Sequence, residues 1–112
     1  MSPGTQARLW LAQRVSAMLL AALLLVHLGV MLWAVRGGLS GAEILARTRG
    51  SVWAALLYGL LVVSAAIHAP IGIATICQEW FGIRGRALWV AVAALGVGLA
   101  ALGGTAVWGL VR

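Results

Sequence analysis

Three long apolar stretches constrain this chain more than any other feature of its sequence. They run from about residue 8 to 35, from 51 to 77 and from 87 to 111. Each exceeds the roughly 18 residues that mark a candidate membrane-spanning helix. Hydrophobic residues make up 63% of the chain and charged residues only 9%. The sequence therefore predicts an all-α integral membrane protein, a three-transmembrane-helix bundle that forms a single domain over residues 1–112.

The connections between these stretches are short and carry helix-end signals. Residues 1–6 are predicted to be a polar tail. Gly37-Gly38 stops the first helix, and Ser40-Gly41-Ala42-Glu43 has the pattern of a capping box that opens a short interfacial helix. Ser51 is placed to cap the second span. We expect the second connection to cover residues 78–86.

Two features predict how the second and third spans are shaped and packed. Pro70 removes the helical hydrogen bond to the Ala66 carbonyl, so a bend is expected in the second span. Gly96, Ala100 and Gly104 recur at every fourth position of the third span. Such a stripe of small residues favours close helix packing in membranes.

The charges point to a membrane surface or acidic partners rather than to nucleic acid. All eight basic residues are arginines, and with two acids they give a net charge of +6. They lie in the tails, the connections and the first helical turns, without a periodic basic patch, so we expect no nucleic-acid partner. Four arginines fall on each side of the bilayer in a three-span arrangement, so the positive-inside rule does not decide the orientation.

One imidazole lies in the middle of the second span. Ser64, His68 and Gly72 recur at steps of four and share one stripe of a helix. A histidine inside an apolar membrane helix is a candidate functional residue. Here it offers a nitrogen ligand beside a glycine, where a flat cofactor can approach the backbone. Ser64 is the candidate hydrogen-bond partner of this ring, and the alternative is an imidazole that only packs inside the bundle.

Three segments of the chain resemble a known family. They are Trp10-Leu11-Ala12-Gln13-Arg14-Val15-Ser16-Ala17 in the first span, residues 35–45 in the first connection, and His68-Ala69-Pro70-Ile71-Gly72-Ile73 followed by Gln78-Glu79-Trp80. Together they resemble the small three-helix membrane-anchor subunits of succinate dehydrogenase and fumarate reductase, the cytochrome b part of respiratory complex II. The resemblance covers nearly the whole chain in span number, spacing and connection length.

The resemblance implies roles for individual residues. His68 matches the axial ligand of haem b, and Arg14 and Ser16 match residues that help to bind ubiquinone or menaquinone. The family's usual Asp-Tyr pair is Glu79-Trp80 here, so an indole N–H replaces the phenol hydroxyl as donor to the quinone. The resemblance also implies a bacterial inner membrane location with a cytoplasmic N-terminus.

A second histidine raises the question of how many haems are bound. His27 lies eleven residues after Ser16, on the same stripe of the first helix. Measured from the midpoints between flanking tryptophans, His27 and His68 differ in depth by about 10 Å, which argues against one haem clamped by both. Two interpretations remain. Either His68 shares one haem with a histidine of another subunit, or each histidine holds its own haem with partner ligands.

The expected function follows from what the chain carries and lacks. It has no dinucleotide fingerprint and no cysteine cluster, so the flavoprotein and iron–sulfur subunits must supply those parts and the dicarboxylate site. We expect a membrane-anchor subunit that transfers electrons through haem b to a quinone, completed by a second anchor subunit or a second copy of this chain. The alternative is a small assembly or transport subunit without a cofactor. No acid lies inside any span, which weighs against proton-coupled transport.

Overall fold

The computed structural model describes all 112 residues as four helices. Helix α1 spans Pro3–Arg36, α2 spans Gly41–Thr48, α3 spans Val52–Phe81 and α4 spans Arg86–Val111. By length and composition, α1, α3 and α4 could each cross a membrane. The predicted all-α class, with three spans and a short helix between the first and second, is therefore confirmed.

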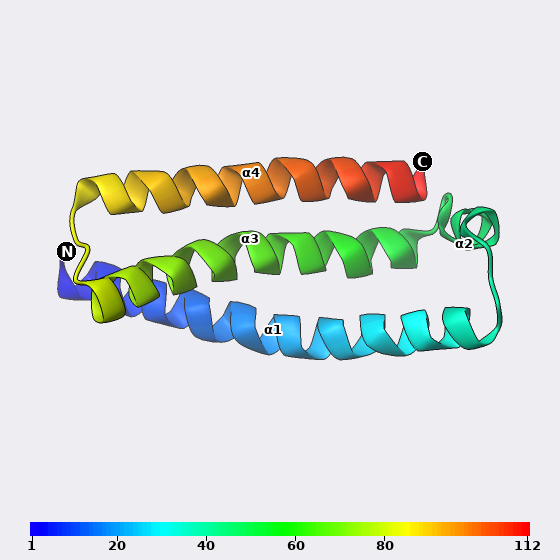
Figure 1. Cartoon of the computed structure of the whole chain (residues 1–112), viewed down its shortest axis with the longest axis horizontal. Coiled ribbons are helices and arrows are strands. Elements are labelled where there is room, and N and C mark those ends of the chain that lie inside the picture. The colour runs from blue at the N-terminus through cyan, green and yellow to red at the C-terminus, as the bar shows by residue number, and fades with distance from the viewer.

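The three long helices lie side by side along the long axis of the molecule, each antiparallel to its neighbour in sequence (Figure 1). Helix α3 packs against α1 on one side and against α4 on the other, and no comparable packing joins α1 to α4. The N-terminus and the α3–α4 connection lie at one end, and α2 and the C-terminus lie at the other (Figure 1). Helix α3 is thus the central helix, and its two packed faces have different partners.

Helix α1 begins earlier than the sequence predicted. The Ser2 hydroxyl accepts a hydrogen bond from the Thr5 N–H at 3.2 Å. Pro3 occupies the first turn, where backbone N–H groups have no acceptor within the helix, so a residue without an N–H is tolerated there. The helix therefore starts at residue 3 rather than near residue 8, and the prediction of a polar tail over residues 1–6 was wrong.

Helix α3 also runs further than predicted. It ends at Phe81, where Gly82 takes the left-handed conformation with a φ of 65° and Ile83 N–H donates to the Cys77 carbonyl at 3.0 Å. Such a glycine-based end satisfies the last carbonyls of a helix. Residues 78–81 therefore form the last turn of α3 and not the start of the connection. Glu79 and Trp80 are helical residues as a result.

The first connection is anchored at both of its predicted caps. Ser40 caps α2 by accepting from the Glu43 N–H, and Ser51 caps α3 by accepting from the Ala54 N–H, both at 3.2 Å. At the last residue of α2, the Thr48 hydroxyl donates to the Leu110 carbonyl at 2.7 Å. These contacts fix α2 beside the C-terminal end of α4.

The α3–α4 contact is built from small residues, but not all those predicted. A Cβ on Gly103 would lie 2.5 Å from Val62 Cγ1, whereas a Cβ on Gly104 would meet nothing within 4 Å. Ala100 is exposed. The contact therefore repeats from Gly96 to Gly103, seven residues on, and the predicted stripe of every fourth residue was wrong beyond Gly96. The contact positions of helices that pack along their length repeat about every 3.5 residues. Residues seven apart therefore lie on the same contact face, whereas residues eight apart do not.

Pro70 lies at the α3–α4 contact. A Cβ on Gly96 would lie 3.0 Å from Pro70 Cγ and 3.1 Å from the Ala66 carbonyl oxygen. That carbonyl is the one whose helical donor the proline removes. The α3 ribbon changes direction in its C-terminal part (Figure 1). At Gly96, as at Gly103, a side chain on α4 would collide with α3.

The α1 residues that face α3 follow an alternating spacing of four and three. This spacing keeps a continuous seam between two long helices. Three of the six residues are polar, so the α1–α3 seam carries the polar groups of the membrane-spanning region. Nine residues of α1 are partly or fully buried, and six of them follow this spacing: Leu9, Gln13, Ser16, Leu20, Leu23 and His27. The prediction that Ser16 and His27 share one stripe of the first helix is confirmed.

Candidate functional site

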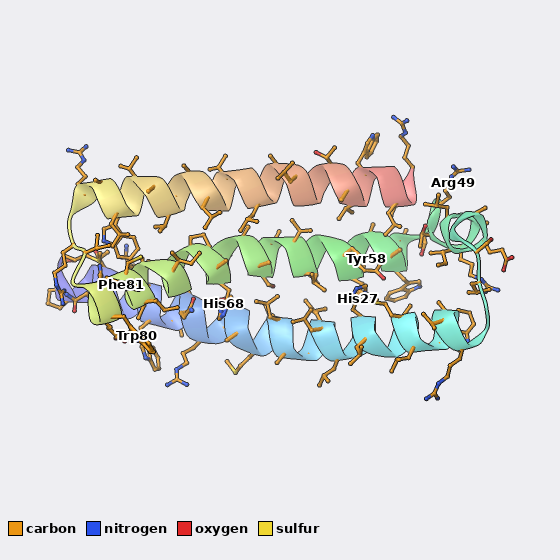
Figure 2. The ribbon with its side chains drawn as sticks, viewed as in Figure 1. His27, Arg49, Tyr58, His68, Trp80 and Phe81 are labelled. Carbon is orange, nitrogen blue, oxygen red and sulfur yellow. The ribbon has the colours of Figure 1, made fainter.

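His68 extends from α3 toward α1 (Figure 2), where its Nδ1 lies 3.5 Å from the Ser16 hydroxyl oxygen. Ser16 is only 3% exposed. Its hydroxyl also donates to the Gln13 carbonyl of its own helix at 3.1 Å. The imidazole is half-buried and is joined through one hydroxyl to the backbone of the facing helix.

Ser64 is not the partner of this imidazole. It is buried, at 3% exposure, one turn before His68 on the same helix. The hydroxyl within reach of the ring belongs to Ser16, and Ser64 makes no hydrogen bond to His68. The predicted Ser64–His68 pairing was therefore wrong, because the ring is turned toward the facing helix instead of back along its own.

The space beside Gly72 is taken by a side chain of this chain. A Cβ on Gly72 would lie 3.1 Å from Nε2 of Gln13. In the chain by itself, the Gln13 amide thus occupies the place where a flat cofactor was expected to approach Gly72. The other amide atom, Oε1 of Gln13, is buried and has no hydrogen-bond partner. An unpaired buried acceptor costs about 1–3 kcal/mol, which makes it a candidate contact for a ligand that donates.

The second imidazole has a partner of its own on the same pair of helices. His27 Nδ1 lies 3.1 Å from the Tyr58 hydroxyl, and the two rings meet edge to face with centroids 5.2 Å apart (Figure 2). Ser16 and His27 are eleven residues apart on α1, which corresponds to about 16 Å at 1.5 Å per residue. The two imidazoles therefore lie at different levels, further apart than the sequence predicted.

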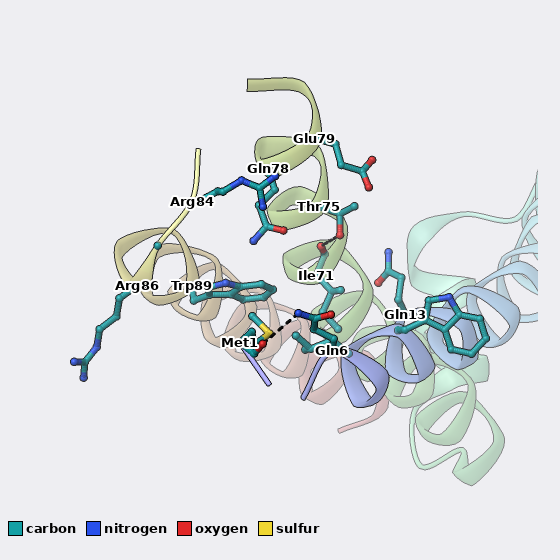
Figure 3. A pocket seen from close by; sticks show the side chains of 13 residues that line it. Met1, Gln6, Gln13, Ile71, Thr75, Gln78, Glu79, Arg84, Arg86 and Trp89 are labelled. Atoms are coloured by element: carbon teal, nitrogen blue, oxygen red, sulfur yellow. Dashed lines mark hydrogen bonds between the residues drawn. The ribbon is translucent and has the colours of Figure 1, made fainter. Parts of the chain in front are cut away.

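A cavity with both polar and apolar lining opens at the end of the molecule that holds the N-terminus. Its volume is about 850 Å³, and it is bounded by the start of α1, the end of α3 and the start of α4 (Figure 3). Gln6 donates from Nε2 to the Met1 carbonyl at 3.2 Å within it. The polar and charged side chains that line the cavity are Gln6, Gln13, Thr75, Gln78, Glu79, Arg84 and Arg86.

The four residues expected at a quinone site are not brought together. Glu79 lines the end cavity, and Ser16 is buried in the α1–α3 seam. Arg14 is exposed, with its guanidinium carbon 5.2 Å from the ring centroid of Trp10. Trp80 is 79% exposed and points away from the helices (Figure 2). Two of the four thus lie on the outer surface.

Sequence reasoning missed two residues that the structure places in contact with the site. Gln13 lies three residues before Ser16 on the same seam, and Tyr58 lies ten residues before His68. Because α1 and α3 are antiparallel, similar spacings in opposite directions bring Ser16 to His68 and His27 to Tyr58. The polar residues at matching intervals on the two spans were the signal for both pairs.

No cluster of three or more histidine, cysteine, aspartate or glutamate side chains is positioned to hold a metal ion. An axial haem ligand needs only one imidazole from a given helix, and His68 and His27 each offer one.

Comparison with known proteins identifies the family. The sequence model of the succinate dehydrogenase/fumarate reductase transmembrane subunit matches residues 1–106. No curated protein and no solved structure matches the chain. The family match covers α1 and α3 completely and most of α4. The chain belongs to the succinate dehydrogenase/fumarate reductase transmembrane subunit family.

Proposed function

We propose that this chain anchors a succinate dehydrogenase or fumarate reductase complex in a bacterial inner membrane, binds haem b through His68 and contributes to a quinone site. The observation that carries the proposal is the imidazole at the middle of α3, inside an apolar span, whose Nδ1 is engaged by the facing helix. Its other nitrogen, Nε2, makes no hydrogen bond within the chain and is the atom offered as ligand.

The residues around His68 fit an axial haem ligand. The ring is half-buried on a helix that is central to the bundle. A bound haem would supply one-electron transfer between an iron–sulfur partner and a quinone. The chain itself contributes the ligating nitrogen, the orientation of the ring and an apolar span that excludes water.

The second axial ligand belongs to another polypeptide in this proposal, either a second anchor subunit or a second copy of this chain. His27 is engaged by Tyr58 about 16 Å along α1 from the level of His68, so both histidines of one chain do not meet at one iron. His27 remains the candidate ligand for a second haem.

The end cavity is the proposed place for the quinone head group. A quinol has O–H donors that suit the unpartnered Oε1 of Gln13, whereas a phosphodiester head group offers only acceptors. Glu79 is the one carboxylate lining the cavity and is the residue able to accept a proton from the quinol. Arg14 and Trp80 are exposed in the single chain, and they contribute to the quinone site once a partner subunit covers this surface.

The orientation proposed for the chain is the one that the family resemblance implies. We place the N-terminal end on the cytoplasmic side, where the flavoprotein and iron–sulfur subunits dock. Arg84 in the α3–α4 connection and Arg86 at the start of α4 then face the anionic headgroups and these partners. Electrons pass between the docked iron–sulfur subunit and the quinone at this end.

The test is a pyridine haemochrome assay on the purified complex, expressed as haem per flavin. We expect one or two haems, and the His68→Ala complex should lose one. His27→Ala separates the two interpretations, because it retains the full haem content if one haem is bound and loses one if two are bound. A colourless wild-type complex would instead support an assembly or transport subunit without cofactor.

A further inference from the structure

We propose that Ser16 is a positioning residue for His68: its hydroxyl accepts a hydrogen bond from Nδ1–H and thereby fixes Nε2 as the unprotonated nitrogen of the ring. The contact joins α1 to α3 within the buried seam. The consequence for iron rests on the proposed haem function, whereas the protonation of the ring is a property of this chain alone.

The protons available to the two residues decide the direction of the hydrogen bond. A serine hydroxyl carries one proton. Ser16 donates that proton to the Gln13 carbonyl at 3.1 Å. The only interaction left for the Ser16 oxygen toward His68 is as an acceptor, so Nδ1 carries the hydrogen and Nε2 carries the lone pair.

The burial of Ser16 separates this role from quinone binding. Ser16 is 3% exposed and does not line the end cavity, so a quinone in that cavity does not reach it. One turn along the seam, the Gln13 amide fills the space over Gly72. The Gln13–Gly72 and Ser16–His68 contacts belong to one register of the two antiparallel helices. From the first contact to the second, the residue number increases by three on α1 and decreases by four on α3, which is about one turn on each helix. The 3.5 Å contact at His68 is longer than the usual range of about 2.7–3.2 Å for an N–H···O bond, and it lies one helical turn from the Gln13–Gly72 contact.

The hydrogen bond should alter the chemistry of the ligating nitrogen. An imidazole that donates through one nitrogen is a more basic ligand through the other. A more basic axial ligand favours ferric over ferrous iron and lowers the reduction potential. Ser16 would thus set both which nitrogen is presented and how strongly it donates.

The first experiment needs no haem. The full chain, labelled with ¹⁵N-histidine and reconstituted in lipid nanodiscs, is studied by nitrogen NMR to determine which nitrogen of His68 is protonated. We expect Nδ1–H in the wild type and in Ser16→Thr, and a shift toward Nε2–H in Ser16→Ala. The matched control is Ser64→Ala, an equally buried serine without a bond to the ring, which should leave the spectrum unchanged. A wild-type ring protonated on Nε2, or a Ser16→Ala spectrum identical to wild type, would overturn the proposal.

The second experiment uses the assembled complex and follows the haem absorbance during a redox titration. Ser16→Ala should raise the midpoint potential, while Ser16→Thr and Ser64→Ala should match the wild type. Equal shifts in Ser16→Ala and Ser64→Ala would indicate a packing effect and refute the positioning role. If Ser16→Ala does not assemble, Ser16→Cys, whose sulfur is a weak acceptor, takes its place with the same expected direction. A complex without haem refutes the proposed function, and the NMR experiment still decides the role of Ser16.

Discussion

The Tyr58 hydroxyl on α3 lies 3.1 Å from Nδ1 of His27 on α1, and the two rings are nearly perpendicular, at 87° (Figure 2). The same two helices hold the Ser16–His68 contact about three turns away with the roles exchanged. Helix α1 supplies the hydroxyl at one level and the imidazole at the other. Polar pairs of this kind specify the register of helices in a membrane. Apolar side chains do not, because contact with lipid tails is as favourable for them as contact with another helix.

Replacing Tyr58 by Phe should weaken the α1–α3 contact by about 0.6 kcal/mol, a typical value for a hydrogen bond between membrane helices. The ring and its edge-to-face contact are retained, so the loss reports the hydroxyl alone. A double-mutant cycle with His27→Phe, measured by unfolding of the full chain in mixed detergent micelles, gives the coupling energy. A coupling energy of zero would contradict the pairing.

Gly103→Ala should destabilise the protein by about 1–3 kcal/mol, the usual cost of overpacking. The new methyl group would meet Val62 at 2.5 Å, too close to be accommodated without moving α4 away from α3. Gly104→Ala is the matched control, because its methyl group meets nothing within 4 Å. Thermal unfolding in detergent should separate the two variants, and equal stability would show that the contact does not follow the seven-residue repeat.

Thr48→Val should loosen α2 at the end of α4, where the Gly50 N–H still donates to the Val111 carbonyl at 2.7 Å. The variant removes the 2.7 Å hydrogen bond to the Leu110 carbonyl at nearly constant volume, at a cost of about 0.5–1.5 kcal/mol. Hydrogen exchange followed by mass spectrometry should show faster exchange over residues 41–50. Thr48→Ser keeps the hydroxyl and should exchange like the wild type. Unchanged exchange in the valine variant would mean that other contacts hold α2.

Gln13→Met should raise the KM for quinone by about five- to tenfold, as expected for the loss of about 1–1.4 kcal/mol from one hydrogen bond. The variant also removes the buried acceptor that lacks a partner, so its stability should be unchanged or higher. Steady-state quinone reduction and thermal unfolding of the complex measure the two effects. Gln6→Met, at the same cavity but with its amide already bonded to Met1, is the comparison. An unchanged KM in Gln13→Met would exclude Gln13 from the quinone site.

Local patterns predicted the features that depend on one helix at a time. The caps at Ser40 and Ser51, the shared stripe of Ser16 and His27 and the different depths of the two imidazoles all follow from spacing along a single segment. The partner of His68 could not be predicted in this way, because it depends on the register of α1 relative to α3. Apolar periodicity fits several such registers, and only the polar pairs distinguish them.

The same limit explains the error at Gly104. Its spacing from Gly96 fits an isolated helix, whereas the contact face is chosen by the partner helix and favours Gly103. The ends of α1 and α3 were misplaced for another reason. Strong end signals at Ser2 and Gly82 extend each helix beyond the apolar stretch by about one turn.

Pro70 and Gly96 illustrate how a defect in one span constrains the next. The proline leaves the Ala66 carbonyl without its helical donor, and the absent side chain at position 96 lets the α4 backbone come up to that oxygen. A Cα–H group can then interact weakly with it. These two positions should consequently covary among relatives. Residues larger than glycine at position 96 should occur only in chains with a residue other than proline at position 70, whose backbone N–H restores the hydrogen bond to the carbonyl of residue 66 in α3.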